Sequence, residues 1–283
     1  MCIPPRQLVG AEGNDGAMQL FVREAGELRR PLLVFIHGGG VSGWMWERQV
    51  EYFQERYHVL VPDLPGHGRS MQLSFLSIHQ HARELIQLVK SRRAEGQPVF
   101  LIGFSLGAQI VMEMLSHAEK GMISGAVIIS GLSRPVRGMT LPVLKPIIRL
   151  SMPITRYRWF AKLQAKELYI PEEQFEAYYN DSKHVTTSNL ISVIDSSLSY
   201  ELPESFARHT VNTLVLIGAK EKRDLHHSAA VLTSRNASCT GYRFEGVGHG
   251  ISLAQPDVFN MLLESWLQDQ ELLPGFPQLE RIS

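Results

Sequence analysis

The chain has 283 residues, of which 44% are hydrophobic and 20% are charged, a composition typical of a globular protein with one large core. Lysine plus arginine and aspartate plus glutamate both number 28, so no single-sign field favours nucleic acid or an anionic membrane as a partner. The two cysteines, Cys2 and Cys239, are too few for a disulfide framework and have no metal-binding spacing. Because the N-terminus lacks signal-peptide features and no apolar run is long enough to span a membrane, we expect a cytoplasmic protein without a membrane partner.

The first part of the chain alternates apolar runs with amphipathic stretches, after a loose N-terminal arm at 1–17. Short apolar runs rich in β-branched residues are typical of buried strands, and apolar residues at intervals of three and four are typical of helices. The predicted elements are an edge strand at 18–24, a central strand at 32–36, a helix at 44–55, a strand at 57–62 and a helix at 75–94.

The rest of the chain continues this alternation, with one interruption. Strands are predicted at 99–104, 126–130, 213–217 and 242–245, and helices at 108–117 and 256–268. Residues 132–206 differ because they hold six prolines, helical pieces and no convincing strand. Alternating strands and helices imply a mostly parallel sheet that is covered on both faces. We therefore expect an α/β core formed by 1–131 and 207–283, with 132–206 inserted as a helical cap.

The strand at 99–104 runs into a sharp turn whose sequence, at 103–107, is Gly-Phe-Ser-Leu-Gly. Between a strand and a helix, this Gly-x-Ser-x-Gly pattern is typical of a nucleophile elbow, in which a strained backbone lifts the serine hydroxyl clear of the chain. A Cβ at either glycine would crowd the adjacent strand or helix. We therefore predict Ser105 as a catalytic nucleophile. The Leu106 backbone N–H, at the helix N-terminus, is predicted to donate to a developing oxyanion.

A serine nucleophile needs a base that takes its proton. His249 follows the last predicted strand and lies in a glycine-rich loop before the closing helix, so we predict it as the base. His226 and His227, near the predicted acid, are weaker alternatives.

The base in turn needs a carboxylate that fixes its tautomer. After the strand at 213–217, Glu221 falls three residues beyond Gly218 and Asp224 falls six residues beyond it. Both satisfy the chain order of serine, acid and histidine. We favour Glu221 as the acid and keep Asp224 as the alternative.

A glycine run at 37–40, His-Gly-Gly-Gly, follows the central strand. Without Cβ atoms its backbone can approach a reacting carbonyl closely, so the Gly39 N–H is predicted as the second oxyanion donor, with Gly40 as the second choice. His37 is predicted to hold this loop through hydrogen bonds, and Asp63 to brace the turn after the next strand. No Gly-Lys-Ser/Thr sequence follows the run, and the run does not match the pattern Gly-x-Gly-x-x-Gly, so it is not predicted to bind phosphate. The sequence also contains no recognised metal-binding spacing, so we expect no cofactor and no metal.

Together these segments resemble the α/β-hydrolase superfamily, and more closely its lidded, esterase- and lipase-like serine hydrolases. The matching pieces come in the family's order: His-Gly-Gly-Gly at 37–40, Asp-Leu-Pro-Gly-His-Gly-Arg-Ser at 63–70, the elbow at 103–107, Gly-Ala-Lys-Glu at 218–221 and Gly-His-Gly at 248–250. The resemblance implies an eight-stranded, mostly parallel sheet with an antiparallel second strand and a cap after the sixth strand. It also implies the roles given above to Ser105, His249, Gly39 and Leu106. Glu221 stands where the family usually has aspartate.

These observations predict a carboxylesterase-like hydrolase. We expect it to cleave an ester, thioester or lactone of a small, partly apolar substrate through a serine–histidine–acid triad and an acyl-enzyme. The same apparatus also suits a carbon–carbon hydrolase, a lyase or an acyltransferase, because the cap sets the substrate. A third alternative is a ligand-binding protein without activity on a hydrolase scaffold. The sequence does not indicate an oligomeric state.

Overall fold

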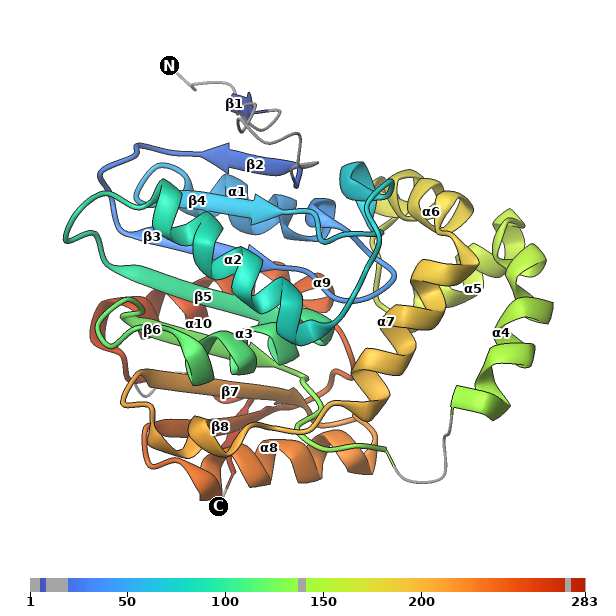
Figure 1. Ribbon diagram of the computed structural model, residues 1–283. Coiled ribbons are helices and arrows are strands. Elements are labelled where there is room, and N and C mark those ends of the chain that lie inside the picture. The colour runs from blue at the N-terminus through green and yellow to red at the C-terminus, as the bar shows by residue number, and fades with distance from the viewer. Residues whose placement is uncertain (1–5, 9–19, 137–140, 273–275, 283) are drawn as a thin grey trace.

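The computed structural model describes residues 6–8, 20–136, 141–272 and 276–282. They form a nine-stranded sheet with helices on both faces (Figure 1), in the strand order β1-β2-β4-β3-β5-β6-β7-β8-β9. The strands are β1 (Arg6–Leu8), β2 (Val22–Ala25), β3 (Leu32–Ile36), β4 (His58–Pro62), β5 (Val99–Phe104), β6 (Gly125–Ile129), β7 (Asn212–Gly218), β8 (Cys239–Phe244) and β9 (Leu279–Arg281).

The neighbouring strands from β4 to β8 pair in parallel, and β2 and β9 run against this direction. The expected mostly parallel sheet, with an antiparallel second strand, is therefore confirmed. Two short edge strands differ from the sequence expectation: β1 lies in the segment expected to be a loose arm, and β9 is an addition to the expected eight strands. Both are three residues long and depend on hydrogen bonds to a distant neighbour, which a local apolar pattern cannot predict.

Alternate residues of each central strand face opposite layers. Leu32, Val34 and Ile36 belong to one apolar core, whereas Leu33 and Phe35 belong to the other. The first core is covered by α2 (Ile78–Arg92), α3 (Leu106–His117) and α8 (Arg223–Arg235). The second is covered by α1 (Glu47–Phe53), α9 (Ile251–Ala254) and α10 (Pro256–Asp269). Burial on both faces explains why these strands appear in the sequence as continuous apolar runs.

In the described part of the segment between β6 and β7, four helices lie beyond the carboxyl ends of the parallel strands (Figure 1). They are α4 (Leu141–Thr155), α5 (Arg158–Glu167), α6 (Phe175–His184) and α7 (Thr187–Ser199). Short 3-10 turns lie in the same stretch at Glu172–Gln174 and Glu204–Arg208, and two more precede it at Gly43–Trp46 and Gly68–Ser70. Every helix among the described residues is too short or too polar to cross a membrane.

Specific hydrogen bonds tie two of these helices, α6 and α7, to the rest of the molecule. The Trp44 indole N–H donates to Asp181 on α6 at 2.7 Å. The Asn189 side chain on α7 accepts from the Phe75 N–H at 3.0 Å and donates to the Leu73 carbonyl at 3.2 Å.

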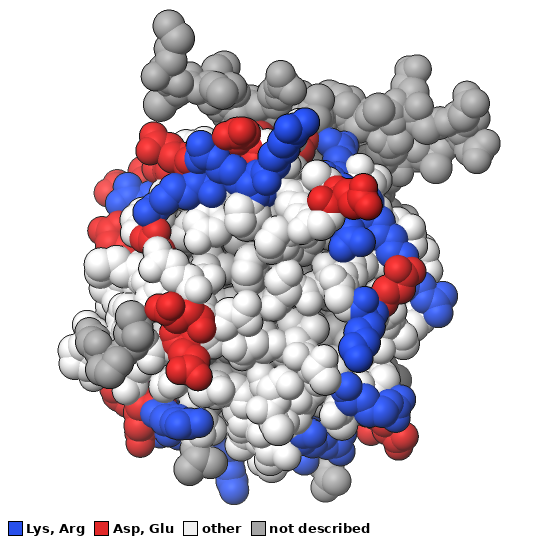
Figure 2. Space-filling model, turned by 90° about the vertical axis from the view of Figure 1, so that its left-hand side faces the viewer, with Lys and Arg blue, Asp and Glu red and all other residues white. Residues whose placement is uncertain are grey.

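Figure 2 shows the side of the molecule that lies away from helices α4 to α7. Basic and acidic side chains lie mainly around the rim of this side and leave a largely uncharged centre.

Candidate active site

The carboxyl ends of the parallel strands bring together residues that lie far apart in the chain. Ser105 directly follows β5, Glu221 lies in the loop after β7, and His249 lies in the loop after β8. In parallel sheets, ligands bind at this edge because the loops after successive strands converge there. The site is therefore built from three separate loops held by one rigid sheet.

Ser105 occupies a strained position at the start of α3. Its φ of 53° and ψ of −110° are unusual for a residue with a side chain, at a cost of about 1–3 kcal/mol. The two glycines of the turn make this bend possible. A Cβ at Gly103 would overlap the Gly107 carbonyl, and a Cβ at Gly107 would overlap the carbonyls of Ile36 and His37. Only glycine therefore fits at positions 103 and 107, and these two glycines permit the sharp turn at Ser105.

His249 lies between the serine and a buried carboxylate. Its Nε2 atom is 3.1 Å from the Ser105 hydroxyl oxygen, and its Nδ1 atom is 3.1 and 3.2 Å from the two carboxylate oxygens of Glu221. An ionised carboxylate only accepts, so Nδ1 carries the proton and Nε2 is free to accept from the serine hydroxyl. The Glu221 side chain is 2% exposed and that of His249 is 30% exposed. The arrangement can therefore move a proton from the hydroxyl to the imidazole.

The alternative residues lie elsewhere. Asp224 is exposed in the first turn of α8 and lines a separate cavity that also includes Ser228 and Arg235. His226 and His227 follow it on the same helix. The structure thus brings Glu221, and not Asp224, to His249.

The glycine run packs directly against the elbow. A Cβ at Gly38 would lie 2.9 Å from the Phe104 ring, and one at Gly39 would lie 3.9 Å from the Leu106 side chain. Gly40 has a φ of +78°, a conformation that favours glycine. Leu106 is the first residue of α3. The two predicted oxyanion donors, Gly39 and Leu106, therefore belong to segments that meet beside Ser105.

His37 holds this loop, as predicted. Its Nδ1–H donates to the Gly38 carbonyl at 2.8 Å, and its Nε2 atom accepts from the Leu64 N–H at 2.9 Å. Complete burial lowers its pKa to about 4, so the imidazole is neutral at pH 7. A neutral ring supplies the one donor and one acceptor that this position requires.

Asp63 braces the neighbouring turn, also as predicted. Its carboxylate accepts from the Gly43 N–H at 2.7 Å and from the Arg69 N–H at 2.8 Å. Burial raises its pKa, while these two hydrogen bonds act in the opposite direction. The Asp63 contacts tie the loop after β3 to the loop after β4.

Two further side chains contact His249 or its loop: Phe104, which belongs to the predicted elbow, and Tyr169, which carried no signal in the sequence. The Tyr169 hydroxyl, which follows α5, accepts from the Gly248 N–H at 3.2 Å and so holds the loop that carries His249. The Phe104 ring lies 4.8 Å from the His249 ring. Tyr169 lies 79 residues from its partner and belongs to no motif, so local sequence could not have identified it.

A cavity lies between helices α4 to α7 and the loops after β3 and β4, next to the glycine run. Its walls include Gly40, Met71, Tyr178, Leu190 and Val193. A Cβ on Gly39 would lie 3.1 Å from Val193, so this cavity adjoins the glycine loop. Ser105 does not line this cavity, which approaches the site at Gly40 and Val193.

A model of the alpha/beta hydrolase family matches residues 33–262. The pimeloyl-[acyl-carrier protein] methyl ester esterase of Methylococcus capsulatus is 32% identical over 117 residues, which cover 41% of this chain and 42% of that protein. The (E)-2-((N-methylformamido)methylene)succinate hydrolase of Acinetobacter baylyi is 21% identical over 83% of this chain and 90% of that protein. Among solved structures, an esterase from Exiguobacterium antarcticum has a TM-score of 0.72 at 21% identity, covering 88% of this chain and 95% of the esterase.

Proposed function

Because this chain belongs to the alpha/beta hydrolase family, and is similar to esterases and other hydrolases, we propose that it is a carboxylesterase-like serine hydrolase with Ser105 as the nucleophile. His249 is the proposed base and Glu221 the proposed acid. The observation that carries this proposal is the chain of contacts from the Ser105 hydroxyl through His249 to Glu221. Three groups from three loops, within hydrogen-bond distance in this order, match the geometry of a serine triad.

In the proposed reaction, His249 Nε2 takes the proton of Ser105 as the hydroxyl oxygen attacks a carbonyl carbon. The backbone N–H groups of Gly39 and Leu106 stabilise the negative charge on the carbonyl oxygen. The imidazolium then protonates the departing alcohol or thiol, which leaves an acyl-enzyme. Water, deprotonated by His249, releases the acid and restores the serine.

Glu221 suits the role of the acid because it is buried and contacts His249 Nδ1 with both oxygens. A buried carboxylate stabilises the imidazolium that forms in each half-reaction, and it keeps the ring in the tautomer that accepts from serine. Glu221 lies three residues beyond Gly218, and its side chain, one methylene longer than that of aspartate, reaches His249 Nδ1 from there.

We propose a small-molecule substrate with a partly apolar acyl or alcohol group. The cavity beside the glycine loop is lined in part by Met71, Leu190 and Val193, which favours such a group. In this proposal, residues 132–206 act as a cap domain that selects the substrate. The core is then formed by 1–131 and 207–283, and the protein acts in the cytoplasm on small molecules, without a nucleic-acid or membrane partner.

A fluorophosphonate probe tests the proposal directly. We expect the probe to form an adduct that peptide mass spectrometry locates at Ser105, and we expect hydrolysis of p-nitrophenyl esters that disappears in Ser105→Ala. The control is Ser116→Ala, which removes a half-buried hydroxyl from the same helix. If folded wild-type protein forms no adduct and hydrolyses no ester, the non-catalytic alternative is favoured. Equal hydrolysis of short-chain and long-chain esters would contradict the apolar substrate group.

A further inference from the structure

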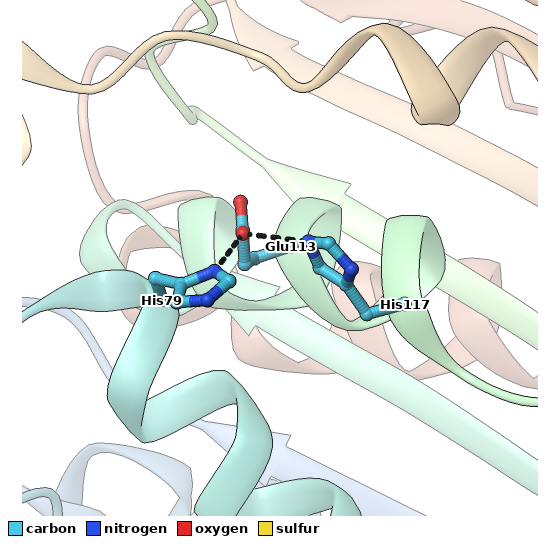
Figure 3. Close-up of side chains that lie close together, drawn as sticks. All are labelled: His79, Glu113 and His117. Carbon is cyan, nitrogen blue, oxygen red and sulfur yellow. Dashed lines mark hydrogen bonds and ion pairs between the residues drawn. The ribbon is translucent and has the colours of Figure 1, made fainter.

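A second cluster of titratable side chains lies away from the triad, on the outer side of α2 and α3. His79 is in the first turn of α2, whereas Glu113 and His117 lie on α3. The spacing of four residues between Glu113 and His117 places them on one face of the helix. Figure 3 shows the carboxylate of Glu113 between the two imidazole rings, one from each helix.

The three side chains converge on a small volume. The distance from His79 Nδ1 to Glu113 Oε1 is 2.6 Å, and that from His117 Nε2 to the same oxygen is 3.0 Å. One nitrogen from each imidazole and one carboxylate oxygen all lie within 4.8 Å of one another. The side chain of Glu113 is 6% exposed, but those of His79 and His117 are 45% and 39% exposed. Solvent therefore reaches the cluster from the side of the two rings.

The remaining carboxylate oxygen is held from behind. The buried hydroxyl of Tyr200, at the end of α7, donates to Glu113 Oε2 at 3.3 Å. The hydrogen bond to Oε2 fixes the orientation of the Glu113 carboxylate, and Oε1 remains the atom that would bind an ion. Side chains that contact metal ligands, but not the metal, orient those ligands in the same way.

Two imidazole nitrogens and one carboxylate oxygen are ligands that suit Zn²⁺ and related divalent transition metals. Zinc binds such atoms at about 2.0–2.2 Å, so tetrahedral ligands lie about 3.3 Å apart. The contacts of 2.6 and 3.0 Å to Glu113 need to open by less than 1 Å, and the two imidazole nitrogens, which lie within 4.8 Å of each other, need to reach about the same separation. The side facing solvent leaves room for water as a fourth ligand.

We propose that His79, Glu113 and His117 form a surface site for Zn²⁺ or a similar divalent transition metal. When the ion binds, each imidazole gives up the N–H proton that it directs at Glu113 and takes up a proton from solvent on its other ring nitrogen, so each ring stays neutral and binds the ion through an unprotonated nitrogen. The ion joins the start of α2 to the end of α3, and Tyr200 supports the carboxylate. This site is independent of the proposed hydrolase activity.

The test is a titration of the full chain, free of any affinity tag, with Zn²⁺ in a buffer without phosphate, followed by calorimetry. We expect one tight site per chain with a dissociation constant in the micromolar range or below. The double variant His79→Ala/His117→Ala should weaken this binding by at least about tenfold. The matched control, His226→Ala/His227→Ala, removes two histidines from α8 and should retain the site.

Thermal unfolding gives a second measurement, because a ligand that binds the folded state raises the melting temperature. Zinc should raise the melting temperature of the wild type and of the α8 control, but not that of the His79→Ala/His117→Ala variant. Both replaced rings are partly exposed, so circular dichroism should show a folded protein in each case. If the double variant binds Zn²⁺ as tightly as the wild type, or the wild type shows no saturable site, the proposal is wrong and the cluster is a hydrogen-bonded brace.

Discussion

Glu221 contacts His249 Nδ1 with both of its carboxylate oxygens, at 3.1 and 3.2 Å, although the two residues lie 28 positions apart. This geometry brings a glutamate to the position where an acid is needed, while Asp224 faces a different cavity. The contact therefore predicts different effects for substitutions at Glu221, in the loop after β7, and at Asp224, in the first turn of α8.

Replacing Glu221 by Gln should lower kcat for an activated ester by about 10³- to 10⁴-fold, because the neutral amide neither stabilises the imidazolium nor holds the correct tautomer. Glu221→Asp should retain more activity than Glu221→Gln, since it keeps the charge at a greater distance. Asp224→Asn is the matched control and should retain wild-type kcat. A large loss in Asp224→Asn with little loss in Glu221→Gln would reverse the assignment.

Replacing Gly107 by Ala should destabilise the fold by about 1–3 kcal/mol or more, because the new methyl group overlaps backbone carbonyls of β3 and the following loop, which cannot move independently. Gly121→Ala is the control: its φ is +81°, but no atom lies within 4 Å of the new Cβ, so the cost is about 1–2 kcal/mol from backbone strain alone. Urea unfolding of both variants provides the comparison. Equal losses would show that the elbow tolerates a side chain at Gly107.

The stability of the protein should fall as the pH drops from about 6.5 toward 4. His37 has a pKa lowered to about 4 by burial, so the folded state disfavours the protonated ring and the unfolded chain binds the proton first. Its contribution is fully present above pH 6.5 and reaches roughly 3 kcal/mol in total, lost progressively as the pH approaches 4. His67, with a pKa lowered to about 3 by burial, acts in the same direction.

Urea unfolding at a series of pH values checks this prediction. His37→Asn retains a donor and an acceptor but does not titrate, so its stability should depend less on pH in this window. The control is His184→Asn, which replaces an exposed histidine of α6 and should leave the wild-type pH dependence unchanged. If the free energy of unfolding of His37→Asn changes with pH as steeply as that of the wild type, the His37 ring does not contribute to the pH dependence.

Replacing Tyr169 by Phe removes the acceptor of the Gly248 N–H and should cost about 1 kcal/mol of stability. We also expect kcat to fall by roughly two- to tenfold, because the loop that orients His249 loses one of its anchors. Tyr179→Phe removes another tyrosine hydroxyl from the same group of helices, where it bonds the Arg156 carbonyl, and serves as the control. Equal kcat values in wild type and Tyr169→Phe would show that the loop is held without this contact.

Much of the fold could be predicted from local patterns. Continuous apolar runs marked the buried strands because the sheet is covered on both faces, and the helix predicted at 256–268 is observed at Pro256–Asp269. The helix after the elbow begins at Leu106, two residues earlier than the apolar pattern indicated, because Leu106 and Gly107 already have helical backbone. Boundaries of this kind depend on capping and packing more than on periodicity.

The candidate site could be predicted where one short segment fixes its own backbone. Gly103 and Gly107 specify the bend at Ser105 because only glycine fits between the strand and its neighbours. The choice between Glu221 and Asp224 could not be made in the same way, since both follow β7 within six residues. The distance from His249 to each of these two carboxylates depends on the pairing of β7 with β8 in the sheet and on the paths of the loops that follow these strands.

The sequence by itself determined the alternating α/β architecture, the strained turn and the order of the residues proposed for catalysis, because these follow from side-chain size and polarity along a few consecutive residues. Only the tertiary structure decided which carboxylate meets His249, that Tyr169 holds its loop, and that His79 lies beside Glu113 and His117. These contacts join segments up to 79 residues apart, and the packing of helices on the sheet, rather than any local pattern, determines their distances.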